Sequence, residues 1–558
     1  MSEFKNRSEN GIYSSILDGE IWQSIEKRYH GKIVLPLLLY FDDFEINNPL
    51  GSHSNIQKIG AVYYTIPCMP RKYGSILENI FLAQLHRTQS MKHLGTKIIF
   101  QNIINEFSHI EKEGITISLF GEKKQIYFVL TAIIGDNLGL NEILGFTTSF
   151  NSDYCCRICT VDKTNRCTQL QEDTTIIRNR RNYASHVEDC SYGVSDECIF
   201  NSLMNFHVTE NITLDYMHDV LEGICRYELR DILNELINVQ KLFSLETLNC
   251  RIKFFDIGSK SGVNKPPLIP ESLFHKKFLI LSASEMLCLV RFLGLIIGDL
   301  VPLNNRAWKL WVLLREIICL ILSPVISKET CILLQNIIRE HHELYLKLFS
   351  DKLKPKHHFL LHYPNVIRKY GPVKYISSFR FEAKHKNFKN GCCMVTSRKN
   401  PPHTISLNHQ LQLNYRFLLN EGFSDRLHIG TSCELEICRN TDYYFFKDKL
   451  PDNIGTACKF VQWISIFGTK HKVGMAVVID TDDIVLTFGK IKYIMVTERH
   501  KIYFVIVQMH TKSFITHYHA YEVVETSVWQ VVAQEHLTDY SPYNLHIQSD
   551  EKVLIACI

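Results

Sequence analysis

The sequence has none of the short motifs that mark nucleotide-dependent or serine-type enzymes. It contains no G-x-x-x-x-G-K-[ST] phosphate loop, no G-x-S-x-G turn and no H-E-x-x-H helix. Each of these motifs places a phosphate cradle, a nucleophile or a zinc pair at a fixed spacing. Without them, ATP use and serine-type hydrolysis have no basis in the sequence.

The chain also lacks low-complexity tracts, internal repeats and unbroken apolar runs of membrane-spanning length. Its richest apolar stretches, 279–301 and 310–326, are interrupted by charged residues that include Glu285, Arg291, Arg315 and Glu316. Charges at these positions favour buried helices over membrane spans. We therefore expect no membrane among the partners of this chain.

The polar start of the sequence, MSEFKNRSENGIYSS, has no apolar core of the kind that a signal peptide needs. Secretion is therefore not expected. Eighteen cysteines in such a chain predict reduced thiols in an intracellular compartment, with some of them available as metal ligands.

The composition is that of a globular protein, with 46% hydrophobic and 22% charged residues among 558. This length predicts two or three domains. The net charge of +4 is small, but residues 352–400 contain twelve Lys and Arg residues and one acid, Glu382. This segment predicts a surface for nucleic acid or phosphate, with an ordinary solvated helix face as the alternative.

Apolar periodicity predicts the order of the elements along the chain. Strands are expected at 33–42 and 59–68, helices at 75–91 and 97–113, and two further strands around the turn GEKK, the second ending at Asp136. A loop-rich segment, 150–212, precedes a mainly helical region that extends to about residue 350. A helix at 379–389 carries Glu382 on its first turn, and short strands dominate beyond residue 430.

Three carboxylates could meet at one edge of the predicted sheet. Asp42 and Asp136 end neighbouring strands, and Glu382 lies on a following helix. Phosphodiester cleavage by two divalent cations about 4 Å apart needs hard oxygen ligands such as these. Acids at strand ends also commonly cap turns and helices, and the chain has 58 acids. On the residues alone, both interpretations stay open.

Six segments of the sequence together resemble one known family. They are YFDDFEINNPLGSH, LTAIIGDNLGLNEILGF, YCCRIC, LDYMHDVLEGICRYEL, KPKHHFLLHYP and FRFEAKHKNFK. In this order they resemble the transposases of CACTA-type (En/Spm) DNA elements in animal genomes, across most of residues 30–420. More distant plant members share the Asp-x-Phe, Met-His and Phe-Glu signatures.

The resemblance implies an α/β fold with an RNase H-like catalytic core of the DDE type, interrupted by a large, mainly helical insertion. A small all-β domain is expected to follow it. The predicted boundaries are 1–30 for an N-terminal extension, 31–149 for the first part of the core, 150–350 for the Cys-containing helical insertion, 351–425 for the end of the core with the zinc-site histidines and the catalytic Glu, and 430–558 for the β domain.

The implied function is that of a nuclear enzyme that hydrolyses a DNA phosphodiester and joins the freed 3′-hydroxyl to target DNA. Mg²⁺ or Mn²⁺ is the implied cofactor, and DNA and further copies of the chain are the implied partners. A separate DNA-reading partner is also expected, because no zinc finger or helix-turn-helix is recognisable before the first acid. The alternative is a catalytically inactive, transposase-derived protein that binds DNA or protein, since Ser377 and Ser378 stand where the family usually has a Trp.

Carried over residue by residue, the resemblance makes Asp42, Asp136 and Glu382 the catalytic, magnesium-binding triad. Asp42 aligns with the Asp of the Asp-x-Phe signature, and Asp43 is the alternative. Only one of these two can point into the site, because neighbouring residues on a strand face opposite sides.

Cys156 and Cys159 form a C-x-x-C pair, which predicts half of a four-ligand zinc site. The predicted second pair is His357 and His362, with His358 as the alternative to His357 and Cys155 as the alternative to Cys156. The arrangement is similar to the zinc site of the V(D)J recombinase, which closes between the two ends of its insertion. Such a zinc would connect the segments that carry Asp136 and Glu382.

The remaining candidate residues are basic side chains and one Asp–His pair. The predicted DNA contacts after Glu382 are Lys384, His385, Lys386 and Lys389. Arg178, Arg180 and Arg181 could follow a DNA backbone or solvate a loop. Asp215 and His218 lie one helical turn apart in a motif typical of the family, and their role stays open.

Overall fold

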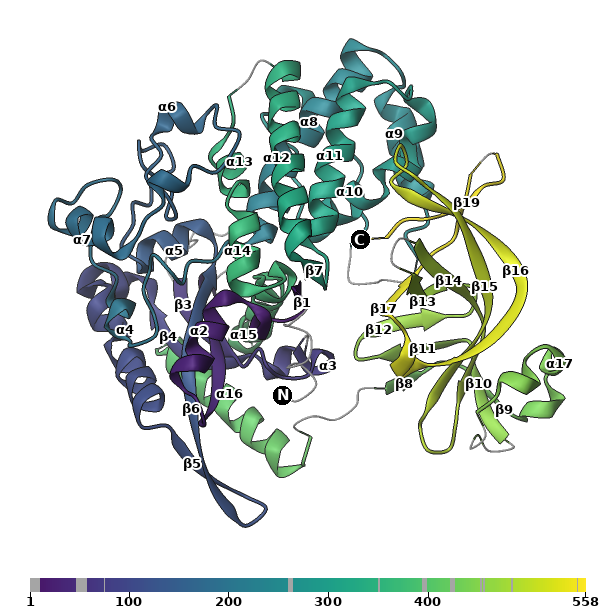
Figure 1. The fold of residues 1–558 in the computed structure, drawn as a ribbon, viewed down its shortest axis with the longest axis horizontal. Helices are drawn as coiled ribbons and strands as arrows, with labels where there is room; N and C mark the ends of the chain where they lie inside the picture. Colours follow the sequence, from purple (N-terminus) through teal and green to yellow (C-terminus); the bar gives the residue numbers. More distant parts are fainter. Residues whose placement is uncertain are drawn as a thin grey trace. The chain divides into compact units, whose positions relative to one another are not determined.

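The chain folds into two compact units in a computed structural model (Figure 1). The first unit comprises Met1–Ile224 and Glu316–Phe423, and the second comprises Cys225–Arg315 and Ser424–Ile558. The structure describes residues 11–46, 58–74, 76–258, 264–349, 352–393, 399–421, 427–451, 454, 457–482, 485–548 and 550–557.

The first unit is built on a five-stranded sheet with the order β4-β3-β2-β6-β5. Its strands are β2 (Ile33–Glu45), β3 (Lys58–Thr65), β4 (Phe81–Arg87), β5 (Ile115–Leu119) and β6 (Glu122–Gly135). β3 runs antiparallel to both of its neighbours, β2 and β4, whereas β6 is parallel to β2. The apolar run LPLLLYF suits β2 because this central strand is covered on both faces.

Helices cover the two faces of this sheet. On one face, Phe41 of β2 meets Phe100 of α4 (Thr88–Lys112), with ring centroids 5.9 Å apart. On the other face, Tyr40 stacks on Phe381 of α15 (Phe379–Cys393) at 4.6 Å, and α2 (Glu20–Arg28) packs through Trp22. The alternation of side chains along β2 therefore assigns each residue of the strand to one helix layer or the other.

The strands expected at 33–42 and 59–68, the strand ending near Asp136 and the helix starting at Phe379 are confirmed. The helix expected at 75–91 is wrong, because residues 81–87 form β4 and pair with β3. Pairing with a sheet edge outweighs a helical pattern in so short a segment. The following helix starts at Thr88 and kinks at Gly95, where φ is +81°.

Beyond the sheet, the first unit continues through a loop-rich segment into several helices. These are α5 (Asn137–Ile143), α7 (Arg180–Glu188), the π-helix η6 (Met217–Ile224), α12 (Lys328–Phe349), α13 (Pro355–Leu360), α14 (Tyr363–Tyr370) and α16 (Pro401–Leu418). A π-helix is rare and is frequently found at functional sites. No helix in the described part of the chain has the length and hydropathy to cross a membrane.

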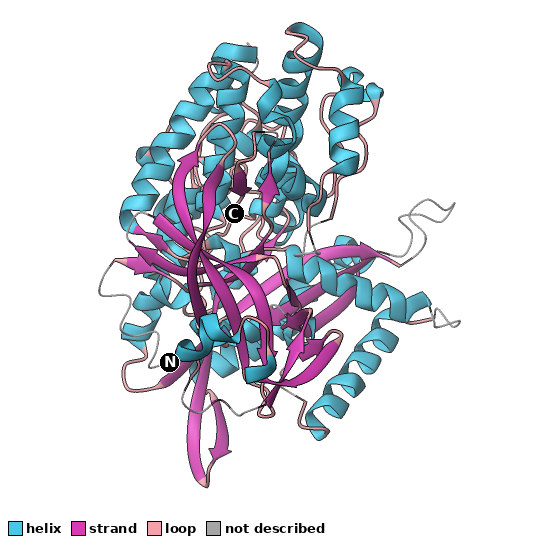
Figure 2. Cartoon of the chain, turned by 90° about the vertical axis from the view of Figure 1, so that its right-hand side faces the viewer, coloured by secondary structure: helices cyan, strands magenta, loops and turns pink. Residues whose placement is uncertain are grey.

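The second unit combines helices of the middle of the chain with the C-terminal strands. Its main helices are α8 (Cys225–Asn234), α9 (Leu245–Phe254) and α10 (Ala283–Ile297), and α11 (Arg306–Ile321) begins in it. The strands form an antiparallel sheet whose order is β17 (Asp539–Tyr543), β13 (Ala476–Asp482), β14 (Val485–Val496), β15 (Ile502–Ile515), β16 (Ala520–Ala533), β19 (Val553–Ile555) and β18 (His546–Ile547). Its long members β15 and β16 are labelled in Figure 1, and Figure 2 draws all strands in magenta. Arg291 of α10 donates to the Ala556 carbonyl at 2.9 Å, which fixes the end of the chain to this helix.

Candidate functional site

Two of the predicted acids lie at matched positions on neighbouring parallel strands. Phe41 of β2 is the register partner of Gly135 of β6, so the next residues, Asp42 and Asp136, follow at the same level. Carboxyl ends of parallel strands meet at one edge of a sheet, which is where open α/β sheets place their sites. The sheet therefore brings these two acids to the same edge.

Asp42 and the adjacent Asp43 face opposite sides of the sheet. The Asp42 carboxylate accepts a hydrogen bond from the Tyr40 hydroxyl at 3.2 Å, on the face covered by α15. Asp43 lies on the other face, near Thr88, and burial raises its pKa to about 6. Of the two, Asp42 is the acid that faces the helix carrying Glu382.

Glu382 is connected to the Asp–His motif of the sequence. The His218 imidazole lies 3.1 Å from Glu382 through Nε2 and 2.6 Å from Asp215 through Nδ1. Burial alone would lower the pKa of His218, but the contacts with Asp215 and Glu382 outweigh it and raise that pKa to about 11. An imidazolium therefore holds Glu382 in place, and Asp215 orients the imidazolium.

Asp42 has a corresponding histidine. The Nε2 atom of His385 lies 3.3 Å from the Asp42 carboxylate, and its Nδ1 atom lies 3.1 Å from the Tyr63 hydroxyl. His385 is on α15, one turn beyond Glu382, so one helix carries both an acid of the site and the partner of another. The side chains of Asp42 and Glu382 are 26% and 36% exposed, so both remain accessible to a ligand.

Asp136 also closes the start of a helix. Its Oδ1 atom accepts a hydrogen bond from the Gly139 amide at 2.6 Å, as the N-cap of α5. Burial raises the pKa of Asp136, and the nearby Asp42 charge adds to that effect. Burial likewise raises the pKa of Glu382, with Asp42 and Asp215 contributing. The negative charge of Asp42 therefore contributes to the raised pKa values of Asp136 and Glu382.

The oxygen atoms of the three acids are not among the groups whose ligand atoms all lie within 4.8 Å of one another in the described residues. Two of the three instead pair with imidazoles, and the third caps a helix. Neighbouring carboxylates repel one another, so each of them lies against the nearest positive or hydrogen-bond-donating group. Carboxylate oxygens are the hard donors that divalent cations such as Mg²⁺ and Mn²⁺ prefer.

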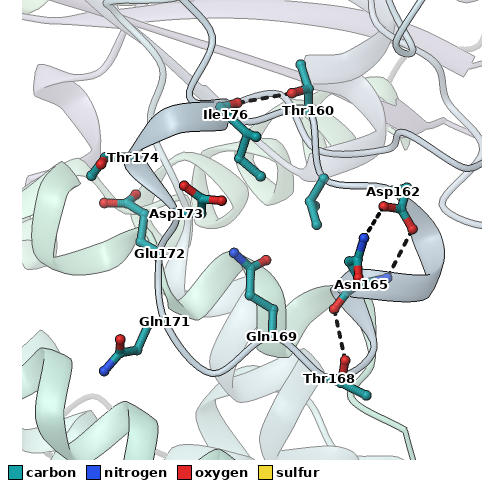
Figure 3. Close-up of a pocket in the computed structure, with 11 residues that line it drawn as sticks. Thr160, Asp162, Asn165, Thr168, Gln169, Gln171, Glu172, Asp173, Thr174 and Ile176 are labelled. Carbon is teal, nitrogen blue, oxygen red and sulfur yellow. Dashed lines mark hydrogen bonds between the residues drawn. The ribbon is translucent and has the colours of Figure 1, made fainter.

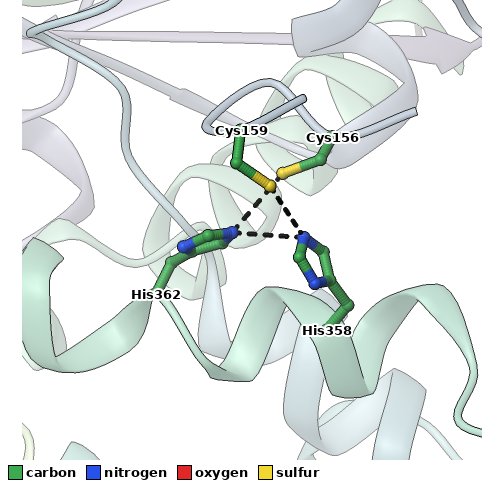
Figure 4. A group of neighbouring side chains, drawn as sticks. All are labelled: Cys156, Cys159, His358 and His362. Atoms are coloured by element: carbon green, nitrogen blue, oxygen red, sulfur yellow. Dashed lines mark hydrogen bonds between the residues drawn. The ribbon is translucent and has the colours of Figure 1, made fainter. Parts of the chain in front are cut away.

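A second group of side chains lies together in the same unit (Figure 4). It consists of Cys156, Cys159, His358 and His362, all buried, with their ligand atoms within 4.8 Å of one another. Cys156 Sγ lies 3.5 Å from His362 Nε2, Cys159 Sγ lies 3.3 Å from His358 Nε2, and the two Nε2 atoms are 3.2 Å apart. This cluster could hold a metal ion.

The distances in this cluster fit one tetrahedral metal. With Zn–S near 2.3 Å and Zn–N near 2.0–2.1 Å, ligand atoms at the corners of a tetrahedron lie about 3.3–3.8 Å apart. His362 also contacts the Glu172 carboxylate through Nδ1 at 2.5 Å, the kind of outer contact that orients a metal-bound histidine. Burial would raise the pKa of Cys156, but Cys159 and the two imidazoles outweigh it and lower that pKa, which favours a thiolate ligand.

His358, and not His357, completes the cluster. His358 and His362 are four residues apart and face the same side of the chain, whereas a residue five positions before His362 points elsewhere. The His357 ring packs against Tyr345 at 5.0 Å, and its Nδ1 atom accepts from the Lys354 amide. Of the two neighbouring cysteines, Cys156 joins the cluster, while Cys155 accepts a hydrogen bond from Arg166 at 2.8 Å.

The loop after the C-x-x-C pair lines an open polar pocket of about 620 Å³ (Figure 3). Local contacts hold this loop, such as the hydrogen bond from the Thr160 hydroxyl to the Ile176 carbonyl at 3.2 Å and the capping of α6 (Lys163–Arg166) by Asp162. Glu172, which contacts His362, lines this pocket. No motif in the polar loop sequence indicated Glu172, because its partner lies 190 residues away.

Two of the four side chains predicted to contact DNA are buried. Lys384 donates to the Leu77 carbonyl at 2.9 Å, and burial lowers its pKa to about 8. His385 lies between Tyr40 and Tyr63. The prediction placed both residues at a phosphate backbone, but α15 turns them toward the protein and leaves Lys386 and Lys389 exposed.

The arginines of the loop-rich segment have different surroundings. Arg178 is buried and donates to the carbonyls of Cys156 and Tyr192, so it supports the loop that carries the C-x-x-C pair. Arg180 forms a bidentate pair with Glu210 at 2.6 and 2.8 Å. Arg181 is exposed.

One buried acid in the motif region had no role in the sequence prediction. Asp219 accepts hydrogen bonds from Asn137 at 2.5 Å and from the Tyr363 hydroxyl at 3.3 Å. It therefore links the π-helix to the residue after Asp136 and to α14. Its position one residue after His218 was the only signal available in the sequence.

The sequence matches no protein-family model, and no curated protein is significantly similar to it.

Proposed function

We propose that this protein is a transposase-like DNA nuclease and strand transferase whose RNase H-like core holds divalent cations with Asp42, Asp136 and Glu382. The observation that carries the proposal is the convergence of these acids. Asp42 lies near the end of β2 at the level where the parallel strand β6 ends before Asp136, and Glu382 comes from the helix that covers the Asp42 face of the sheet. A long insertion separates the second acid from the third, as the family resemblance implies.

The proposed roles follow from the contacts of each residue. Asp42, Asp136 and Glu382 supply oxygen donors, and His218 with Asp215 positions Glu382. The His385 ring lies 3.3 Å from the Asp42 carboxylate and limits where that side chain can move. Two Mg²⁺ or Mn²⁺ ions bound here would lower the pKa of an attacking water and stabilise the leaving oxygen of a phosphodiester.

Exposed cations lie on the helix that carries Glu382. Arg380, Lys386 and Lys389 are exposed on α15 and would neutralise phosphates of a bound DNA backbone. Such contacts are independent of base sequence, so a separate DNA-reading partner or a multimer of the chain would supply site selection. The nucleus is the compartment in which we expect this activity.

In this proposal the cluster of Cys156, Cys159, His358 and His362 binds zinc and has a scaffolding role. Cys156 and Cys159 lie on the loop that follows the strand with Asp136, and His358 and His362 precede the helix with Glu382. A zinc ion shared by these pairs would fix the two ends of the insertion to each other. Structural sites with four protein ligands leave no open position for a substrate.

A second function is favoured by the contacts that the acids already make. Asp136 caps α5, and Glu382 and Asp42 each face an imidazole, so all three could serve the fold alone. A catalytically inactive protein that binds DNA or protein would keep these contacts. It would bind DNA in a salt-dependent way without metal-dependent cleavage.

Nicking of supercoiled plasmid DNA in Mg²⁺ or Mn²⁺ separates these functions. Wild-type protein is expected to nick the plasmid, and Asp136→Asn is expected to lower the rate by about 100-fold or more, as the loss of one charged ligand does at such sites. Asn is as good an N-cap as Asp, so this variant keeps the start of α5.

The matched control is Asp43→Asn, which changes the acid on the opposite face of the same strand. It should retain nicking within a few-fold of wild type, whereas Asp42→Asn should not. Equal activity of the Asp42 and Asp43 variants, or no nicking by wild type alongside salt-sensitive DNA binding, would favour the binding protein.

A further inference from the structure

A cavity of about 340 Å³ in the first unit is lined in part by neighbours of Asp215 and Glu382 in the chain. Its wall includes Tyr216, Phe379 and Phe381, and the cations Lys374 and Arg380 also line it. Apolar side chains such as Ile16 and Met69 complete the lining. This volume is near the lower end of the range of about 300–1,000 Å³ found for small-molecule sites, so it suits one ring system and its substituents.

The cavity shares its wall with the segments that carry the acids. Tyr216 is adjacent to Asp215 in the chain, and Phe381 is adjacent to Glu382. Phe379 lies three residues before Glu382, on the same side of α15. A ligand in the cavity would therefore be held by the same turn of helix that presents Glu382.

The lining has the properties of a stacking surface. The rings of Tyr216 and Phe379 have centroids 5.8 Å apart, and Phe381 is fixed by its stacking on Tyr40. Phe379 is only half-buried, so part of its ring is available to a further aromatic group. Among the described residues that line the cavity there are two cations and no acid, which favours an anionic ligand.

We propose that this cavity binds one unpaired nucleotide of a DNA strand, with the base against Phe379 and the phosphate near Arg380 and Lys374. The inference rests on the proposed function, because it places the bound strand against the first turn of the helix that carries Glu382. An aromatic wall binds any base through its π-face, and guanidinium and ammonium groups bind phosphate. A base held here would fix the adjoining phosphodiester relative to the acids.

The test compares two single strands of equal charge in buffer without added Mg²⁺ or Mn²⁺, where no strand is cut. One is a 12-nucleotide thymidine oligomer and the other is the corresponding abasic oligomer. The full-length protein is expected to bind the thymidine oligomer about 5- to 100-fold more tightly, since a stacked base contributes about 1–3 kcal/mol. An affinity ratio near one would overturn the proposal.

Variants of Phe379 test whether the preference for the thymidine oligomer over the abasic oligomer arises in this cavity. Phe379→Ala should bring the affinity ratio to about one, and Phe379→Trp should retain it. Phe120→Ala, at the exposed turn between β5 and β6, is the matched control and should bind like wild type. A Phe379→Ala protein that keeps its circular dichroism spectrum and also keeps the full base preference would overturn the assignment to this cavity.

Photocrosslinking provides an independent readout that does not require a variant to fold. An oligomer containing 5-iododeoxyuridine should crosslink to peptides containing Tyr216 or Phe379, and crosslinks found solely in other peptides would overturn the proposal. Failure of the proposed function would be seen separately, as absence of metal-dependent plasmid nicking. Because the base preference is measured without metal, either result can be obtained without the other.

Discussion

Asp42 and Asp43 are neighbours in the chain, yet their surroundings give them different chemistry. Asp42 is partly exposed and lies against a hydroxyl and an imidazole, whereas burial raises the pKa of Asp43 to about 6. A carboxyl with a raised pKa is less fully ionised near neutral pH and binds a cation less well. Its orientation toward α15 makes Asp42 the better candidate for a metal ligand, and the raised pKa of Asp43 weakens the case for that residue.

His218 is the residue whose removal should affect the acids most directly. His218→Ala removes the contact that positions Glu382 and leaves Asp215 without its partner. Loss of such an outer contact typically costs about 10- to 100-fold in metal affinity or activity. We expect the Mn²⁺ concentration for half-maximal plasmid nicking to rise by about that factor.

The control for this prediction is His93→Ala, which changes an exposed histidine of α4. It should leave the Mn²⁺ dependence unchanged. A His218→Ala protein with wild-type Mn²⁺ dependence would show that the imidazole does not position a metal ligand.

Among single residues, the sequence predicted best those whose type has few common roles in proteins, such as paired cysteines. The C-x-x-C spacing indicated a metal pair, and the structure places both cysteines in the cluster. The choice between His357 and His358 depended on where a helix begins, and α13 begins at Pro355, which turns His358 toward His362. Glu172 could not be predicted, because its role exists solely through contact with His362.

Among the elements, the strands with the longest apolar runs were predicted well. The run at 33–42 is buried on both faces, and no other element explains such a pattern in so few residues. β4 was missed because FLAQLHR is short and mixes apolar with polar residues. It is a strand through its pairing with β3, which is a property of the sheet and not of the segment.

The metal-binding cluster connects two elements that lie far apart in the chain, and its metal content tests that connection. Purified wild-type protein is expected to contain about one zinc per chain, because four ligands fill a tetrahedral site. His358→Ala should lose most of this zinc and unfold at a lower temperature, since zinc binding contributes to folding. Elemental analysis and thermal unfolding give the two measurements.

His357→Ala is the matched control, one residue away on the same helix. Because its ring packs against Tyr345 and lies outside the cluster, this variant should keep the zinc. Equal zinc content in the two variants, whether high or low, would contradict the ligand assignment.

For the whole molecule, the pairing of segments distant in the sequence was the least predictable feature. The strands beyond residue 430 were expected from their β-branched and aromatic runs and are present. Their place in one unit with residues 225–315 was not evident, because it depends on contacts such as that of Arg291 with the Ala556 carbonyl. Such contacts leave no periodic pattern in either segment.

The second unit should lose stability on acidification because it buries three neutral histidines. Burial lowers the pKa of His471 and His546 to about 4 and of His519 to about 3. The unfolded chain takes up protons as the pH falls below the ordinary value of about 6.5, while the folded unit does not. Stability is therefore full above pH 6.5 and is lost progressively as the pH falls toward these lowered values.

Each histidine should contribute a slope of about 1.4 kcal/mol per pH unit within this window. Urea unfolding followed between pH 7 and pH 5 measures the slope. His519→Phe replaces a ring that packs against Phe514 with one that does not titrate. The slope should therefore fall by the contribution of one histidine, about 1.4 kcal/mol per pH unit. An unchanged slope in this variant would contradict the assignment of His519 as a buried neutral group.

The central claim is that Asp42, Asp136 and Glu382 form one cation site, and Mn²⁺ binding measures it most directly. Electron paramagnetic resonance of full-length protein titrated with Mn²⁺ should detect bound Mn²⁺ that is lost in Asp42→Asn and Asp136→Asn and retained in Asp43→Asn. Mn²⁺ binding that is the same in all three variants, or absent from wild type at millimolar Mn²⁺, would contradict the account.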